Sequence, residues 1–211
     1  MSRGLFIVIE GPEGAGKSTL AAALADRLSR AGHDVVPVRE PGGTGPAELA
    51  RQALLDPSSE LDPETELLFV AAARAHLVQA VIRPALQAGR TVVSDRYDLS
   101  TMAYQAAGRG LPADMVTAVN RTATRGLTPD LTLVLDVPPG EGRRRQLAVG
   151  KGTDRFERED AAFHERVRTA YQAASGAGIV HIDATATPQA VLAAAWAAVQ
   201  ERTGALGAGA D

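Results

Sequence analysis

Short apolar runs alternate along this chain with longer stretches in which apolar residues recur at helical spacing. The short runs are rich in valine, isoleucine and leucine, which is typical of strands buried on both faces of a sheet, and they predict strands at 5–9, 34–39, 90–94, 131–136 and 179–182. The longer stretches predict helices at about 17–30, 47–55, 62–88, 99–107, 113–125, 141–147, 160–174 and 188–202. Strands that alternate with helices form parallel sheets. The pattern therefore predicts an α/β fold in three layers, a five-stranded parallel sheet with helices on both faces.

One domain accounts for almost the whole length. The chain has 211 residues, 45% of them hydrophobic, which suffices for one full core. Neither an internal repeat nor an interdomain linker is visible. We expect a single domain over 1–203 and a flexible C-terminal tail over 204–211.

Charge and cysteine content narrow the function classes. The net charge of −3 argues against a protein that coats nucleic acid or an anionic membrane. Cysteine is absent, which removes disulfides, thiolate catalysis and cysteine-ligated zinc. The apolar run 5–9 is too short for a secretory signal, and the run 190–199 is too short to span a membrane. These features predict a cytoplasmic protein with no nucleic-acid or membrane partner.

A glycine-rich segment joins the first predicted strand to the first helix and has the pattern G-x-x-x-x-G-K-[ST]. In this setting, backbone N–H groups and the positive end of the helix dipole bind phosphate. Lys17 adds a compact charge for the β- and γ-phosphates, and the Ser18 hydroxyl suits Mg²⁺. The chain has only two lysines and otherwise uses arginine, so a lysine at this position indicates a need for a compact ammonium group. The segment predicts an ATP site and a P-loop NTPase fold, and its members are Gly11, Pro12, Glu13, Gly14, Ala15, Gly16, Lys17, Ser18 and Thr19.

A second set of charged residues lies at the ends of predicted strands and in a glycine-hinged segment. Its cations suit phosphate oxygens, and they are Arg39, Arg96, Arg144, Arg145, Lys151 and Arg155. The segment 144–157 holds several of them and predicts a short basic lid. Asp95 ends a buried strand and can reach Mg²⁺. Asp136 ends another strand and is the alternative, although Arg96 beside Asp95 favours the former.

The histidines give a clue to the acceptor, because none occupies a promising catalytic position. A phosphate acceptor is already anionic and needs only positioning and charge stabilisation, whereas a hydroxyl acceptor usually needs a general base. The sequence therefore favours a phosphorylated acceptor. Glu13 is unusual in an anion-binding loop, because phosphate repels its carboxylate. We expect its side chain to face a hydroxyl of the second substrate or to lie idle in solvent.

Taken together, these residues resemble the bacterial type of thymidylate kinase over nearly the whole chain. The matching segments are 11–18, 39–44, 95–97, 100–101 with 104–105, 108–110, 129–132, 135–136, 154–157 and 182–184. The resemblance implies transfer of the γ-phosphoryl group of ATP to dTMP, which gives dTDP and ADP in dTTP biosynthesis. It also implies Mg²⁺ as cofactor and a homodimer.

The resemblance implies roles for individual residues as well. Lys17 and Ser18 would hold the ATP phosphates and the metal, with Asp95 in the metal shell. Arg39 and Arg96 would bind the acceptor phosphate, and Glu13 would meet the sugar 3′-hydroxyl. The base and the rest of the substrate would be held by Arg74, Ser100, Thr101, Tyr104 and Gln105, of which Thr101 and Gln105 share a helix face. The lid would supply the catalytic cation, and its candidates are Arg145, Lys151 and, favoured, Arg155.

One position departs from the family pattern. The family usually has phenylalanine four residues before the arginine equivalent to Arg74, where this chain has Val70, and its phenylalanine is Phe69. Five residues of regular helix turn Phe69 about 140° away from Arg74. Either Val70 lines a looser base pocket, or a π-bulge near 71–73 returns Phe69 to the base.

Two other functions are compatible with the sequence. One is a kinase for another (deoxy)pyrimidine monophosphate, which the departure at Phe69 and Val70 keeps open. The other, from a different class, is a P-loop nucleotide-binding switch or regulator. Against a switch, no N-K-x-D segment for reading guanine is present, and a switch has no use for a cationic lid with a second phosphate site.

Overall fold

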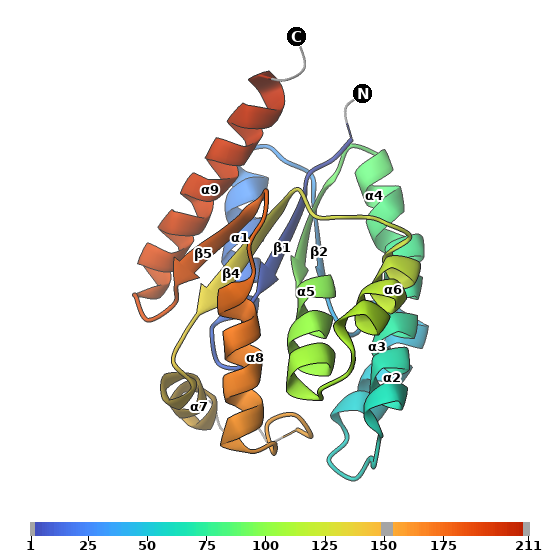
Figure 1. Ribbon diagram of the computed structural model, residues 1–211. Helices are drawn as coiled ribbons and strands as arrows, with labels where there is room; N and C mark the ends of the chain where they lie inside the picture. Colours follow the sequence, from blue (N-terminus) through green and yellow to red (C-terminus); the bar gives the residue numbers. More distant parts are fainter. Residues whose placement is uncertain (1–2, 149–153, 209–211) are drawn as a thin grey trace.

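The computed structural model describes residues 3–148 and 154–208 (Figure 1). Five strands form one parallel sheet in the order β2-β3-β1-β4-β5. They are β1 (Phe6–Glu10), β2 (Val35–Arg39), β3 (Thr91–Asp95), β4 (Leu131–Asp136) and β5 (Ile179–Asp183). The predicted five-stranded parallel sheet is confirmed.

Helices cover both faces of this sheet. They are α1 (Lys17–Arg30), α2 (Gly45–Leu55), α3 (Pro63–Leu77), α4 (Arg83–Gln87), α5 (Asp98–Thr101), α6 (Ala113–Thr124), α7 (Pro139–Ala148), α8 (Ala161–Ala173) and α9 (Pro188–Ala208). Two π-helical segments interrupt the series, η1 (Val78–Ile82) between α3 and α4 and η2 (Met102–Gly108) after α5. The last helix was predicted to end near residue 202, followed by a tail from 204, whereas α9 continues through Ala208.

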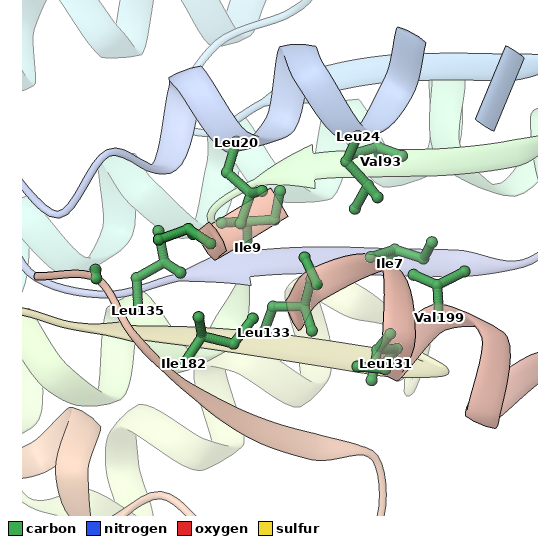
Figure 2. Packing of buried hydrophobic residues seen from close by; sticks show 14 of the residues in the cluster. Ile7, Ile9, Leu20, Leu24, Val93, Leu131, Leu133, Leu135, Ile182 and Val199 are labelled. Atoms are coloured by element: carbon green, nitrogen blue, oxygen red, sulfur yellow. The ribbon is translucent and has the colours of Figure 1, made fainter. Parts of the chain in front are cut away.

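The alternation of side chains along β1 explains the two cores. Successive residues of a strand point to opposite faces. Ile7 and Ile9 face α1 and α9, and Figure 2 shows Leu20 and Leu24 reaching from α1 toward them. Phe6 and Val8 face the other way, into a core shared with α3, η1 and α4. The apolar residues of β1, from Phe6 to Ile9, therefore hold the two helical layers together.

The register of the strands brings their carboxyl ends to one edge. Arg39 lies opposite Asp95, and Asp95 lies opposite Ile9, one residue before the end of β1. In Figure 1 the two chain termini lie at the opposite end of the sheet. Ligand sites of open α/β sheets lie at the carboxyl ends of the strands, so the predicted site residues meet where such a site is expected.

The continuous helical stretch Pro63–Gln87 is the one candidate membrane span within the described residues, with 25 residues and a mean hydropathy of 1.4. In the fold this stretch packs on the sheet and buries Glu66 and Arg74. Buried charges with protein partners are features of a core helix in a globular fold.

Candidate active site

A cavity of about 970 Å³ opens at the carboxyl edge of the sheet. It is lined by the glycine loop and by residues of β2, α2, α3, β3, η2 and α7. The predicted site residues in its lining are Glu13, Gly14, Ala15, Gly16, Lys17, Ser18, Thr19, Arg39, Val70, Arg74, Asp95, Arg96, Ser100, Thr101, Tyr104, Gln105 and Arg145. Outside the lining formed by the described residues lie Gly11, Pro12, Phe69 and Arg155. The predicted Lys151 lies outside the described residues.

The glycine loop has the conformation that an anion site requires. Gly11, Gly14 and Gly16 have positive φ angles of 140°, 71° and 90°, which glycine adopts readily. Gly16 precedes α1, and no described side chain caps this helix, unlike α2, α3 and α8 with Thr44, Asp62 and Asp160. The first N–H groups of α1 are therefore left for a ligand.

Lys17 folds back over the loop. Its Nζ donates a hydrogen bond to the Pro12 carbonyl at 2.7 Å. Burial, together with repulsion from Arg96, lowers the pKa of Lys17 to about 8. An anion beside Nζ would favour the charged form again.

Ser18 and Asp95 form the candidate metal site. The Ser18 hydroxyl donates to Asp95 Oδ2 at 2.5 Å, and the buried Asp95 Oδ1 has no partner within residues 3–148 and 154–208. The alternative, Asp136, instead accepts hydrogen bonds from Arg168 and Gln172 on α8. No group of three or more histidine, cysteine, aspartate or glutamate residues is placed to hold a metal ion in the part of the chain that the structure describes. A hydroxyl and one carboxylate suit Mg²⁺, which takes its other ligands from water and phosphate.

Arg96 and Glu13 form a partly buried ion pair beside the loop. Arg96 has a φ of 75°, and its Nη2 donates to Glu13 Oε1 at 2.6 Å and to the Tyr104 hydroxyl at 3.1 Å. Tyr104 also donates to Glu13, at 2.9 Å. Burial acts to raise the pKa of Glu13, but the charges of Arg96 and Lys17 outweigh it and lower this pKa to about 2. The idle, solvent-facing Glu13 is thus not what the structure shows.

A buried acid supports Arg96 from behind. Glu10 is fully buried and accepts hydrogen bonds from the Ser100 hydroxyl at 2.6 Å and from the Tyr171 hydroxyl at 3.1 Å. Arg96 Nη1 donates to the same two hydroxyls, each at 3.1 Å. Burial raises the pKa of Glu10. The direction of the guanidinium is therefore set by a network that the sequence patterns did not reveal.

Two further arginines, Arg39 and Arg51, line the cavity. Arg39 donates to Glu48 at 2.9 Å, and about half of its side chain is exposed. Arg51 donates to the Pro41 carbonyl at 2.9 Å. The sequence patterns missed Arg51. Its position one turn after the buried Ala47 on α2 is the signal that could have found it.

Arg74 lines the cavity and is buried, with 1% of its surface exposed. Its Nε donates to Glu40 at 2.7 Å, and its Nη1 donates to Thr101 Oγ1 at 2.7 Å and Asn120 Oδ1 at 2.6 Å. Its Nη2 donates to the Tyr97 carbonyl at 2.7 Å. A guanidinium held at four points cannot rotate, so its remaining N–H has a set direction. Glu40 and Asn120 were not predicted, because only the tertiary fold brings them to Arg74.

The structure decides between the two alternatives for Phe69 and Val70. Helix α3 is regularly α-helical through Leu77, and its π turn begins only at Val78, after Arg74. The hypothesis of a π-bulge near 71–73 is therefore wrong. Phe69 packs on Ala47, Ala50 and Ala73, whereas Val70 lines the cavity.

The predicted lid cations occupy different places. Arg145 lines the cavity and donates to Glu141 and to the Ala184 carbonyl, each at 2.9 Å. Arg144 is exposed on α7. Arg155 lies outside the cavity lining formed by the described residues, and its Nη2 donates to the buried Glu66 at 2.6 Å and its Nε to the Leu54 carbonyl at 3.1 Å.

Comparison with known proteins finds relatives along most of the chain. Residues 9–194 match a family model described as thymidylate kinase. A thymidylate kinase of Deinococcus radiodurans is 46% identical over 205 residues, which cover 96% of this chain and 99% of the relative. One of Thermomicrobium roseum is 48% identical over 199 residues, covering 93% and 94%. One of Pseudomonas putida (strain GB-1) is 53% identical over 169 residues, covering 80% of each chain.

Proposed function

The chain belongs to the thymidylate kinase family, and from this premise we propose how its site transfers the γ-phosphoryl group of ATP to dTMP, giving dTDP and ADP. The observation that carries the proposal is that one cavity holds both a phosphate loop and a second group of arginines, Arg39 and Arg96. Two phosphorylated molecules bound there would lie end to end. Positioning and charge stabilisation account for most of the catalysis in phosphoryl transfer.

The glycine loop would bind the ATP phosphates. The uncapped N–H groups of α1 face the place where they would lie, and Lys17 would exchange the Pro12 carbonyl for phosphate oxygens. Ser18 and Asp95 would hold Mg²⁺, which supplies positive charge for the oxygens of the transferred group. The unpartnered Asp95 Oδ1 supports this assignment.

The acceptor would bind on the other side of the cavity. Arg39, Arg51 and Arg96 would hold the dTMP phosphate, whose own negative charge makes a general base unnecessary. Glu13 would meet the sugar 3′-hydroxyl, with Tyr104 and Ser100 beside it. The base would lie over Val70, with Arg74, Thr101 and Gln105 at its edge.

The lid cations would complete the transition state. Arg145 already lines the cavity. Arg155, which we propose as the catalytic cation, would have to leave Glu66 to reach the phosphates, and Lys151 is the remaining candidate. A cation that reaches the transferred group only at closure stabilises the transition state more than the ground state.

We also propose a cytoplasmic homodimer. Two large exposed apolar side chains lie on neighbouring helices, Leu49 on α2 and Leu68 on α3, and Met115 lies on the adjacent α6 (Figure 1). Neighbouring apolar residues of this kind mark interaction surfaces. A second copy of the chain would cover them.

A coupled assay of ADP release tests the proposed reaction. The acceptors are dTMP, dUMP, dCMP, dGMP and AMP, each with ATP and Mg²⁺. We expect release that depends on the acceptor and is fastest with dTMP. ADP release at the same rate with and without every acceptor would instead indicate a nucleotide-dependent switch.

A further inference from the structure

Glu66 is a buried carboxylate that joins three separate elements. It lies on α3 with none of its surface exposed, and it is outside the cavity lining formed by the described residues. Its Oε1 accepts a hydrogen bond from Gln105 Nε2 at 2.6 Å. Its Oε2 accepts hydrogen bonds from Arg109 Nε at 3.0 Å and Arg155 Nη2 at 2.6 Å. Each of these bonds has Glu66 as the acceptor.

The bond to Glu66 determines which way the Gln105 amide faces. A side-chain amide has one end that donates and one that accepts, and the ends are distinguished by their partners. A carboxylate whose charge is compensated by two arginines only accepts hydrogen bonds, so the NH₂ end of Gln105 must face Glu66. The carbonyl end then faces away from Glu66.

The carbonyl oxygen of Gln105 is available to a ligand. Gln105 lines the cavity. Its Oε1 has no partner among the described residues, yet it is not one of the fully buried atoms that lack a partner. The small exposed surface of this side chain therefore includes its acceptor.

We propose that Glu66 is a positioning residue that holds the Gln105 carbonyl toward the cavity and so selects a pyrimidine with a hydrogen on N3. This inference rests on the proposed function, because it assumes that the base of the acceptor lies at Gln105. Glu66 itself would not touch the substrate. Its effect on specificity would pass entirely through the amide.

The neighbouring Arg74 gives the pocket a matching second group. Four of its five N–H donors are bonded to described residues, and one on Nη2 is left. The pocket thus offers a donor from Arg74 beside an acceptor from Gln105. Thymine and uracil present the complement, the O4 acceptor beside the N3–H donor. Cytosine presents the reverse, an amino group beside an unprotonated N3, and would leave buried polar groups unpaired.

The test compares Glu66→Gln with a matched control, Arg109→Gln. Arg109 also binds Glu66, and its Nη1 binds Glu159 at 2.6 Å. Its guanidinium lies 5.7 Å from the ring centroid of Phe156, a lining residue, but Arg109 itself is not part of the cavity lining and donates no side-chain hydrogen bond to Gln105 among the described residues. Glutamine at 66 can donate as well as accept, so the amide of Gln105 is free to turn over. Glu66→Gln leaves the Arg109 guanidinium without its buried carboxylate partner, which can destabilise the fold. The double variant Glu66→Gln/Arg109→Gln removes that cation as well and serves if the single variant is unstable.

The measured quantity is the ratio of kcat/KM for dTMP to kcat/KM for dCMP. We expect Glu66→Gln and the double variant to lower this ratio at least tenfold, mainly through a higher KM for dTMP. Arg109→Gln should leave the ratio within about twofold of wild type. A dTMP analogue methylated at N3 should be an at least tenfold poorer acceptor than dTMP for the wild-type enzyme.

Three results would overturn the proposal. One is equal loss of kcat/KM for dTMP and dCMP in folded Glu66 variants, which a purely structural role would produce. Another is an equal fall of the ratio in Arg109→Gln. The third is full activity of wild type with the methylated analogue, which needs no variant to fold. If wild type fails to phosphorylate dTMP at all, the proposed function itself is wrong.

Discussion

At the scale of single residues, the protonation of Lys17 makes both the charge of the site and the stability of the fold depend on pH. Its folded pKa of about 8 lies below the ordinary 10.5, because the ammonium is buried and close to Arg96. Between these two values the unfolded chain holds a proton that the folded chain has released. Stability should therefore rise as pH increases from about 8 to 10.5, because the folded state no longer carries a buried charge.

Lys17→Ala should lower kcat by about two orders of magnitude or more, because in the proposed reaction it removes a cation that would meet the transferred phosphoryl group. The variant should unfold no more readily than wild type at pH 7, since it removes a buried charge. Steady-state kinetics and thermal unfolding measure the two effects. In wild type, binding of ATP to the free enzyme should weaken above about pH 8, and Lys17→Ala should lack this step. A kcat close to that of wild type would contradict the role of Lys17.

The candidate site was predicted unevenly from the sequence. Residues within contiguous motifs, such as Lys17, Asp95 and Gln105, were predicted as site residues and lie in one cavity lining, because a short segment carries both their chemistry and its local structure. Arg51 and Glu66 were missed. Their roles depend on which helix faces the tertiary fold brings together, and no local pattern contains that information.

At the scale of elements, the sequence patterns did not predict where the two π-helical segments, η1 and η2, lie. Helical periodicity assumes 3.6 residues per turn. A π-helical segment has i→i+5 hydrogen bonds and departs from that period over only one or two turns, which is too short a stretch for the apolar pattern to locate. The stretch 62–88 was predicted to be one helix, with a π-bulge near 71–73 as an alternative, and the structure has a π-helical segment at Val78–Ile82 instead. A π turn does occur in this stretch, but it lies beyond Arg74 and so leaves the angle between Phe69 and Arg74 as in a regular helix.

Phe69 and Val70 should respond differently to truncation. Phe69→Ala removes packing against Ala47, Ala50 and Ala73, and should lower stability by about 1–3 kcal/mol, less than for a fully buried ring, with little change in the KM for dTMP. Val70→Ala should raise that KM severalfold with a smaller loss of stability. Denaturant unfolding and steady-state kinetics measure both. A larger KM effect for Phe69→Ala than for Val70→Ala would show that the base meets Phe69.

The glycine loop and α7 are in close backbone contact at Gly142. A Cβ added to Gly142 would lie 2.5 Å from the Glu13 carbonyl, whereas one added to Gly140 meets nothing within 4 Å. Gly142→Ala should therefore displace the loop and raise the KM for ATP about tenfold, even though alanine favours helix. Gly140→Ala, in the same helix, should leave the KM for ATP unchanged. Equal KM values for the two variants would mean that α7 moves aside at no cost.

At the scale of the whole molecule, the proposed homodimer can be tested at α3. Sedimentation velocity should give a mass near twice the 21.9 kDa of one chain. Leu68→Glu places a charge on a side chain that is 61% exposed in the single chain, and should shift the protein toward monomers. Leu147→Glu changes a leucine on α7 that is 69% exposed; it serves as the control and should leave the mass unchanged. A wild-type protein that sediments as a monomer at all concentrations would refute the dimer.

The fold class was predicted and the spatial order of the strands was not. Apolar runs that alternate with helices identify a covered parallel sheet, because few other arrangements bury both faces of each strand. The order β2-β3-β1-β4-β5 depends on pairings between distant segments, such as Phe6 with Val92 and Ile7 with Leu131. Nothing within a single strand specifies these partners.

The bond between Arg155 and Glu66 has a consequence for the rate at which ATP is hydrolysed when no acceptor is bound. Charged hydrogen bonds contribute about 1.5–3 kcal/mol each, so a guanidinium bonded to a buried carboxylate is free roughly ten- to a hundredfold less often. If Arg155 completes the transition state, water that reaches ATP before the nucleotide acceptor has bound meets a site without that cation. Hydrolysis of ATP by water would then be slow in the absence of the acceptor, because Arg155 stays bonded to Glu66.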